Sequence, residues 1–333
     1  MAKFPSQNKL QYAHAAAVSN DGWTSLTTRN AADDGTVSGH LNLPKDLSIL
    51  NRRGYSSTSN KGVPLVYRCK IDLFLQDEDG FGLDAAVGTD FCTTLKIDGA
   101  QNNWVMRNAA VKWHAARDNM WKKAGVKRKN LGSWANAIRY NYDANGDSWV
   151  QPTDGDGNPF TGGTWDVSTI VDMIDNEYQL CLVGDGVDED GSTSVSVLSI
   201  GHSYLSSRAT VPADSNLEAS EVPAIYSHLT QLLSPTNLES GTEEAYIRTD
   251  VATEQDNPPY QVFATDTLTH DCTEPVELGR AIAGLGNSFG SVIVDIPFGI
   301  ANLRMTHYDS ADTNVTSSPC ISLELLDIYE MQG

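Results

Sequence analysis

The stretch Leu65-Val-Tyr-Arg-Cys-Lys-Ile-Asp-Leu-Phe-Leu75 decides what kind of fold this chain adopts. Apolar residues occupy every second position, namely Leu65, Tyr67, Cys69, Ile71, Leu73 and Leu75. The positions between them include Arg68, Lys70 and Asp72. A period of two predicts a β-strand with one buried face and one face toward solvent. Gln76-Asp-Glu-Asp-Gly80 follows directly and predicts the turn that ends the strand.

Short strands of this kind dominate both halves of the chain. The sequence predicts further strands at Asp90–Ile97, Ala135–Tyr142, Glu177–Val183, Thr193–Tyr204, Thr242–Ala252, Pro259–Thr267, Ser291–Pro297, Asn302–Tyr308 and Cys320–Tyr329. Helical patterns occur around Leu10–Val18, at Asn102–Gly125 and at Glu274–Leu285, which has Pro275 in its first turn. Because helices are too few for a repeated βαβ unit, we expect an all-β fold with a few inserted helices. Sandwiches and jelly rolls are built in this way.

A Pro-rich stretch separates the two sets of strands. Pro212, Pro223 and Pro235 interrupt a Ser/Ala/Glu-rich segment that has no strand alternation. A length of 333 residues also favours about two domains. The predicted parts are a polar N-terminal arm (1–40), a first β domain (41–205) carrying the helix 102–125, a connection (206–240) and a second β domain (241–333).

The charge of the chain is divided unevenly along its length. Residues 1–140 contain 19 Lys and Arg against 12 Asp and Glu, whereas residues 141–333 contain 4 against 31. The net charge of −20 argues against nucleic acid as the main partner, because phosphates are repelled by an acidic surface. Such a division is typical of a protein that has an inside and an outside or that packs against copies of itself.

The helix predicted at 102–125 carries most of the positive charge. Its apolar stripe is formed by Val105, Ala109, Trp113, Ala116, Met120 and Ala124. Asn102 or Asn103 can cap its start, and Gly125 can end it in a left-handed conformation. Residues 102–140 hold nine basic residues and a single acid, Asp118.

Three partners fit this basic helix. Nucleic acid would use Trp104, Trp113 and Trp121 to stack on bases, although Trp113 falls on the apolar stripe and is more simply a core residue. An anionic membrane surface would attract the lysines. A neighbouring copy with an acidic surface needs no other molecule, and we favour this interpretation.

Gly286-Asn-Ser288-Phe-Gly290 matches the nucleophile-elbow pattern of serine hydrolases. In those enzymes the serine lies on a turn between a strand and a helix, which exposes its hydroxyl. Here a helix-like segment precedes the motif and a strand-like run follows it, so the order is reversed. We therefore interpret Ser288 as part of a turn and expect no enzyme activity, with a serine hydrolase as an alternative.

Oxygen-bearing side chains alternate along Asp143-Ala-Asn145-Gly-Asp147, and Asp154 follows shortly after. Alternate oxygens on one turn can converge on a hard cation, so Asp143, Asn145, Asp147 and Asp154 form a possible calcium loop. The EF-hand pattern is not met, because Ser148 replaces the glycine and Asp154 the glutamate. An Asp/Asn/Gly turn between strands explains the segment more simply. A calcium-dependent carbohydrate-binding β-sandwich is the corresponding alternative function.

Other motifs exclude several classes of site. The seven histidines have no HxH or HExxH spacing, and there is no CxxC pair or glycine-rich phosphate loop. The five cysteines lie in or beside apolar runs, as free thiols do in a protein made in a reducing compartment. We also expect neither a secretory signal nor a membrane-spanning helix.

The run Ser291-Val-Ile-Val-Asp-Ile-Pro-Phe-Gly-Ile300 continues into Ala301-Asn-Leu-Arg-Met-Thr306, and the strand Ile321–Glu330 follows. This end of the chain resembles the last part of the second barrel in double jelly-roll major capsid proteins of tailless, membrane-containing icosahedral bacteriophages, such as a lipid-containing Flavobacterium phage. In that family a strand enters a Pro-Gly corner and continues as a hairpin that closes the barrel.

The resemblance implies two tandem jelly-roll β-barrels and a structural, non-enzymatic role. Three chains with two barrels each would form a pseudo-hexagonal capsomer, and capsomers would tile an icosahedral virion shell over an internal membrane. The implied partners are further copies of the chain, minor capsid and vertex proteins and the lipid membrane, with no specific nucleic acid. The implied location is the virion capsid, assembled in the host cytoplasm. No cofactor is required, although calcium could bind at interfaces. The basic helix would face the capsid interior or a neighbouring subunit.

Overall fold

The structure is a computed structural model of the chain. It describes residues 8–13, 36–76, 92–127, 130, 132, 137–143, 149–153, 160, 165–171, 177–184, 187–188, 196–209, 273–284, 289–308 and 318–332.

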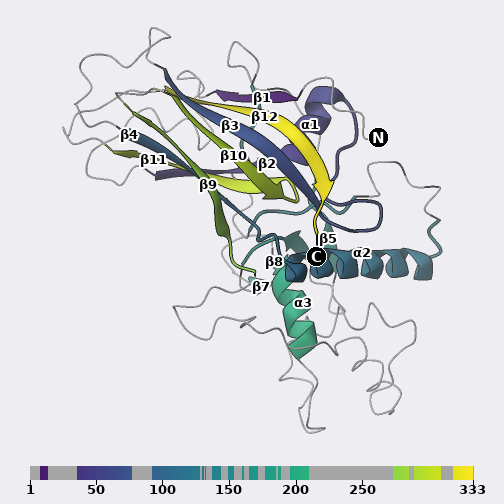
Figure 1. Cartoon of the computed structure of the whole chain (residues 1–333). Coiled ribbons are helices and arrows are strands. Elements are labelled where there is room, and N and C mark those ends of the chain that lie inside the picture. The colour runs from purple at the N-terminus through teal and green to yellow at the C-terminus, as the bar shows by residue number, and fades with distance from the viewer. Residues whose placement is uncertain are drawn as a thin grey trace.

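Two four-stranded antiparallel sheets pack face to face (Figure 1). The first contains, in spatial order, β1 (Lys9–Ala13), β12 (Ser318–Glu330), β3 (Leu65–Gln76) and β10 (Phe289–Pro297). The second contains β2 (Thr36–Asn42), β11 (Ile300–Tyr308), β4 (Cys92–Gly99) and β9 (Val276–Gly284). The all-β prediction is confirmed, and so is the strand predicted at 65–75.

The order of these eight strands is that of a single jelly roll. Counted along the chain as strands 1 to 8, the sheets read 1-8-3-6 and 2-7-4-5. The space between the sheets is filled by apolar side chains, including Leu41, Ile71, Leu95, Leu303 and Leu323. The barrel interior is therefore a packed core.

The strand pairing corrects the predicted division of the chain. Strands β9 to β12 were expected in a second domain at 241–333. Instead, β10 and β12 pair with the two sides of β3, and β9 and β11 pair with the two sides of β4. The predicted arm 1–40 likewise contributes β1 and most of β2 to the barrel. The reason is that a strand satisfies its backbone groups by pairing with strands that can lie far away in the chain, and the local sequence does not encode which strands these are.

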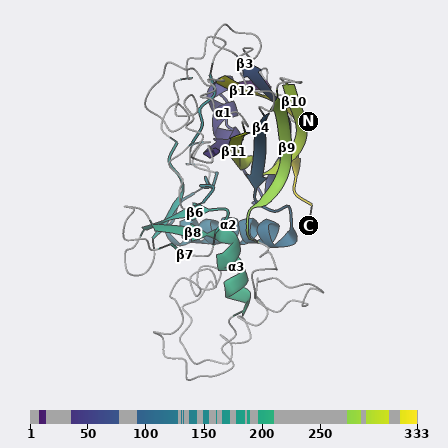
Figure 2. The ribbon, with the colours of Figure 1, turned by 90° about the vertical axis from the view of Figure 1, so that its left-hand side faces the viewer.

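The described part of the chain between β4 and β9, which we call the insertion, forms a second layer (Figure 2). Its described elements are α2 (Trp104–Lys123), β5 (Thr169–Val171), β6 (Glu177–Cys181), β7 (Val187–Asp188), β8 (Ser196–Ser199) and α3 (Ile200–Ala209). Helix α2 lies across the end of the barrel in both views. Its buried residues share a core with Val66, Phe298 and Ile300 of the barrel.

The basic helix predicted at 102–125 is confirmed as α2. Asn103 caps its start by accepting a hydrogen bond from the Met106 backbone N–H (2.9 Å). Gly125 follows its end with φ +73°, the left-handed conformation expected there. Val105, Ala109 and Ala116 of the stripe are buried, whereas Met120 and Ala124, near the end of the helix, are exposed.

Four other helix and strand predictions are wrong. The helix predicted around Leu10–Val18 overlaps strand β1, and the described part of the strand predicted at Ala135–Tyr142 contains only an isolated bridge from Asn141 to Cys181. Glu274–Leu285 was predicted to be a helix, but Val276–Gly284 is strand β9. Its composition favours a helix locally, and pairing with β4 overrides that preference. Ile200–Tyr204, predicted to continue a strand, instead begins helix α3. The strands predicted at Thr242–Ala252 and Pro259–Thr267 lie outside the described residues.

The turn between β10 and β11 connects the two sheets. Gly299 donates its backbone N–H to the Ile296 carbonyl (3.1 Å), and its own carbonyl accepts from Leu43 N–H (2.8 Å). Gly299 has φ +68°, and a Cβ on it would lie 2.7 Å from both Pro44 and Tyr67. Only glycine fits this position.

We expect Gly299→Ala to lower the free energy of unfolding by about 1–3 kcal/mol or more, because it adds both backbone strain and a clash. Urea unfolding followed by circular dichroism measures the loss. Gly54→Ala is the matched control, since a Cβ there would meet nothing within 4 Å. Equal unfolding midpoints for the two variants would contradict this account of the turn.

A buried hydrogen bond joins β1 to α1 (Leu43–Asn51), the helix between β2 and β3. The Tyr12 hydroxyl donates to Asp46 Oδ2 at 2.7 Å, and both side chains are buried. Burial raises the pKa of the Asp46 carboxyl from 3.8 to about 7, although the Tyr12 hydrogen bond acts in the opposite direction. The folded protein therefore favours a neutral Asp46.

The pKa of Asp46 is higher in the folded state than in the unfolded state. The neutral carboxyl therefore stabilises the fold fully only below the unfolded pKa. This stabilisation is lost as pH rises through the folded pKa of about 7. Between acidic and neutral pH, we expect the free energy of unfolding of the wild type to fall by on the order of 4 kcal/mol relative to that of Asp46→Asn. Urea unfolding across a pH series measures this difference. Asp327→Asn, at an exposed position, is the control. Parallel pH profiles for wild type and Asp46→Asn would refute the prediction.

Candidate functional site

The predicted calcium loop is described only in part. Asp143 lies within the described residues, whereas Asn145, Asp147 and Asp154 lie outside them. The Asp143 carboxylate contacts His40, with 3.3 Å between Oδ1 and Nε2. Among the described residues, no group of three His, Cys, Asp or Glu side chains could hold a metal ion. The calcium loop stays a prediction.

A buried polar cluster surrounds His40 on the outer face of the second sheet. The His40 ring centroid lies 5.0 Å from that of Tyr142 and 5.6 Å from that of Trp149, which belong to the insertion. Asn302 on β11 pairs in register with both His40 and Asp98. Burial, then the charges of Asp98 and Asp143, raises the pKa of the Tyr142 hydroxyl. The cluster attaches the insertion to the barrel.

Three atoms of this cluster have no hydrogen-bond partner among the described residues: His40 Nδ1, Tyr142 Oη and Asn302 Oδ1. A buried polar atom left unpaired costs about 1–3 kcal/mol. We therefore expect ordered water or side chains outside the described part to complete the hydrogen bonding here.

The Ser288 motif does not have the surroundings of a nucleophile elbow. Ser288 itself lies outside the described residues. The elements on either side of it are both strands, β9 before and β10 after. The strand-to-helix turn that exposes a catalytic serine is therefore missing at this position.

A cavity of about 410 Å³ lies between the C-terminal half of α2 and two segments of the insertion, 137–139 and 166–170. Most of its wall is apolar, with two arginines at its border. The helix contributes Trp113, Ala116, Arg117, Met120 and Trp121. The size lies within the range of small-molecule sites.

Two guanidinium groups of the cavity stack on indole rings. The Arg117 guanidinium carbon lies 4.4 Å from the centroid of the Trp121 ring, and that of Arg139 lies 5.0 Å from the centroid of Trp165. Arg139 Nη1 also donates to the Asp166 carbonyl at 3.2 Å. Stacking holds both planar cations in place while leaving them positively charged. The cavity border is thus both cationic and aromatic.

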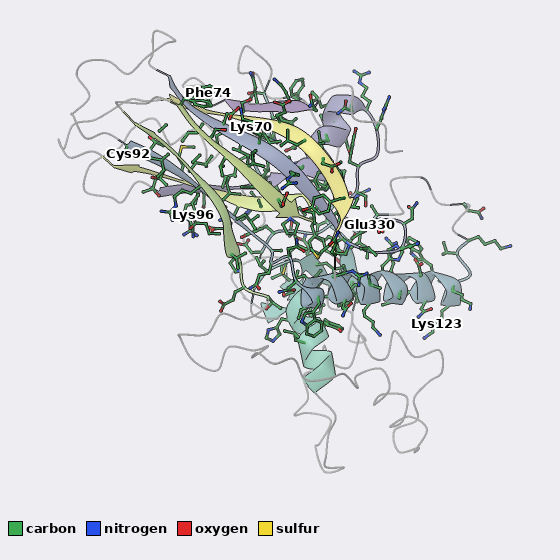
Figure 3. The ribbon with its side chains drawn as sticks, in the orientation of Figure 1. Lys70, Phe74, Cys92, Lys96, Lys123 and Glu330 are labelled. Carbon is green, nitrogen blue, oxygen red and sulfur yellow. The ribbon has the colours of Figure 1, made fainter. Side chains whose placement is uncertain are left out.

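A second hollow, of about 430 Å³, lies on another side of Trp121. It is lined by Asp118, Trp121, Lys122, Gly125, Val126 and Lys127. Lys122 and Lys127 are exposed. The one acid, Asp118, lies 3.8 Å from Arg117 and 3.8 Å from His114, so its charge is offset locally. The end of α2 beyond this hollow projects away from the barrel at Lys123 (Figure 3).

Large apolar side chains are exposed on the edge strands β9 and β10 and on β3 beside β10. Ile293 on β10 is 59 % exposed and Ile282 on β9 is 55 % exposed. Phe289 and Phe74 are partly exposed and in contact, with ring centroids 5.1 Å apart. Phe74 lies toward the end of the barrel remote from α2 (Figure 3). We call these four residues the edge patch. Exposed apolar side chains gathered on neighbouring strands form a surface for contact with another chain.

Sequence reasoning found part of these surfaces. It identified the basic helix and named Trp121, and its expectation that Trp113 is a core residue is confirmed, since Trp113 is 3 % exposed. It missed the pairing of Arg139 with Trp165, because no local pattern connects the two positions. It also missed the edge patch, since alternation predicts which residues share a strand face but not which strands lie at an edge.

No protein-family model matches this chain, and neither a curated protein nor a solved structure does. Among the described helices, none is both long and apolar enough to cross a membrane.

Proposed function

We propose that this chain is the major structural subunit of an icosahedral virus shell that surrounds an internal membrane. The observation that supports the proposal is the jelly-roll order of the eight described strands around a packed interior. Jelly rolls serve as capsid subunits, lectins and cupins. A barrel filled by its own side chains leaves no room for a ligand inside. We therefore look for the function of this barrel on its outer surfaces and on its insertion.

The surfaces support self-association. The edge patch exposes apolar side chains on β9 and β10, the last strands of their sheets, and on β3, which pairs with β10. Subunit interfaces owe most of their energy to apolar area of this kind. The edge patch therefore fits a second copy of the chain. Minor capsid and vertex proteins, the membrane and assembly in the host cytoplasm belong to the same proposal.

The number of barrels per chain bears on the form of the capsomer. A pseudo-hexagonal trimer requires two barrels from each chain, and the described strands complete one. The described strands of 241–333 pair with β2, β3 and β4 in the same barrel, so they form no second barrel. The homotrimer remains our proposal for the capsomer, and its mass can be measured directly.

The purified chain is expected to form an oligomer with three times the 36.1 kDa mass of one chain, and larger plates or shells at high concentration. Size-exclusion chromatography with light scattering measures the mass, and negative-stain microscopy shows the outline. A single-chain mass under all conditions would overturn the shell proposal. Labelling of Ser288 by a fluorophosphonate, or glycan binding by such a monomer, would favour the alternative functions.

Ile293→Lys is expected to reduce assembly at least tenfold, because it places a charge in the centre of an apolar contact. Light scattering measures the assembled fraction, and circular dichroism confirms folding. Gln11→Lys is the matched control, since Gln11 is exposed on β1 of the same sheet. Unchanged assembly by Ile293→Lys would remove the edge patch from the interface.

A further inference from the structure

We propose that the two hollows beside Trp121 bind single-stranded nucleic acid without regard to its sequence. One base would lie in the cavity against the indole rings, and the neighbouring phosphates would lie on the lysines of the second hollow. The proposal goes beyond the shell function and does not rest on it, because binding can be measured on unassembled chains.

The aromatic groups of the first cavity suit a flat ligand. Trp121 lines its wall together with Arg117 and Arg139, and the Arg139 guanidinium stacks in turn on Trp165. Trp113 also lines the wall, but it is 3 % exposed, so its ring is not a stacking surface. Nucleobases stack on such rings and on guanidinium planes whatever their sequence. The Trp113 indole N–H is buried and has no acceptor among the described residues. It is a donor that an acceptor atom of a base could satisfy.

The positive charges are placed where a phosphate backbone would run. Trp121 lines both hollows, so a base held on one side of it brings the adjacent phosphates toward Lys122 and Lys127 on the other. These lysines are exposed and Arg117 offsets Asp118, so the local charge is positive. A cationic groove with interleaved aromatic rings is how proteins hold single strands.

The net charge of −20 does not prevent this contact. Exposed charges more than about 10 Å apart are largely screened from each other at moderate salt. The charges directly beside the ligand therefore determine whether a polyanion binds. An acidic segment of a neighbouring copy would match the same cations. Acidic side chains, however, would not stack on the indole and guanidinium planes of the cavity. For this reason we favour nucleic acid.

Fluorescence anisotropy of a labelled oligothymidylate, titrated with the full chain at low concentration, tests the proposal. We expect binding that weakens as salt increases and that is stronger for the single strand than for the matching duplex. Trp121→Leu should weaken it about tenfold through lost stacking, whereas Trp121→Phe should retain most of it. Lys122→Gln and Lys127→Gln should each reduce the salt slope by about 0.7.

Arg280→Gln is the control for charge, since Arg280 is exposed on β9 and pairs with Glu277. Circular dichroism and thermal unfolding confirm that each variant folds. No binding, equal affinity for the duplex, or an equal loss in Trp121→Leu and Arg280→Gln would overturn the proposal. It would also be overturned if the Trp121 and lysine variants lost self-association while leaving oligonucleotide affinity unchanged. A chain that binds the oligonucleotide but never oligomerises would instead overturn only the shell function.

Discussion

The structure depends on the pairing of β3 with two strands from the other end of the chain. Residues 66–74 of β3 lie between β10 and β12, and their partners in both strands are more than 200 positions away in the chain. Such pairing is expensive in chain entropy and slow to form. Once formed, it places the first and last strands of the barrel side by side, as the β1–β12 register records.

This closure also positions the insertion. Gly99 at the end of β4 pairs with Val276 at the start of β9, so the two ends of the inserted chain leave the barrel together. Phe298 and Ile300, from the turn that joins the sheets, then pack in one core with the buried face of α2. The barrel end therefore serves as a rigid platform. The cationic end of the helix extends beyond it, where partners can reach it.

The two proposals assign separate surfaces to separate tasks. The edge patch is apolar and lies on the barrel, which suits contact between identical subunits. The hollows around Trp121 are cationic and aromatic and lie on the insertion, which suits a polyanion. A shell subunit needs the first surface to bind its neighbours, whereas the second belongs to the separate nucleic-acid proposal. The packed barrel interior takes part in neither.

The sequence by itself determined the strand character of 65–75, the capped helix at 104–123 and its cationic face, because periodicity, caps and charge are local properties. It misassigned Val276–Gly284 as helix and divided the barrel in two, because strand partners are chosen by long-range fit. Only the tertiary structure decided that both chain ends form one jelly roll, that Ile293 lies on an edge, and that Arg139 stacks on Trp165 beside α2. Each of these follows from contacts between residues distant in the chain, which no window of sequence contains.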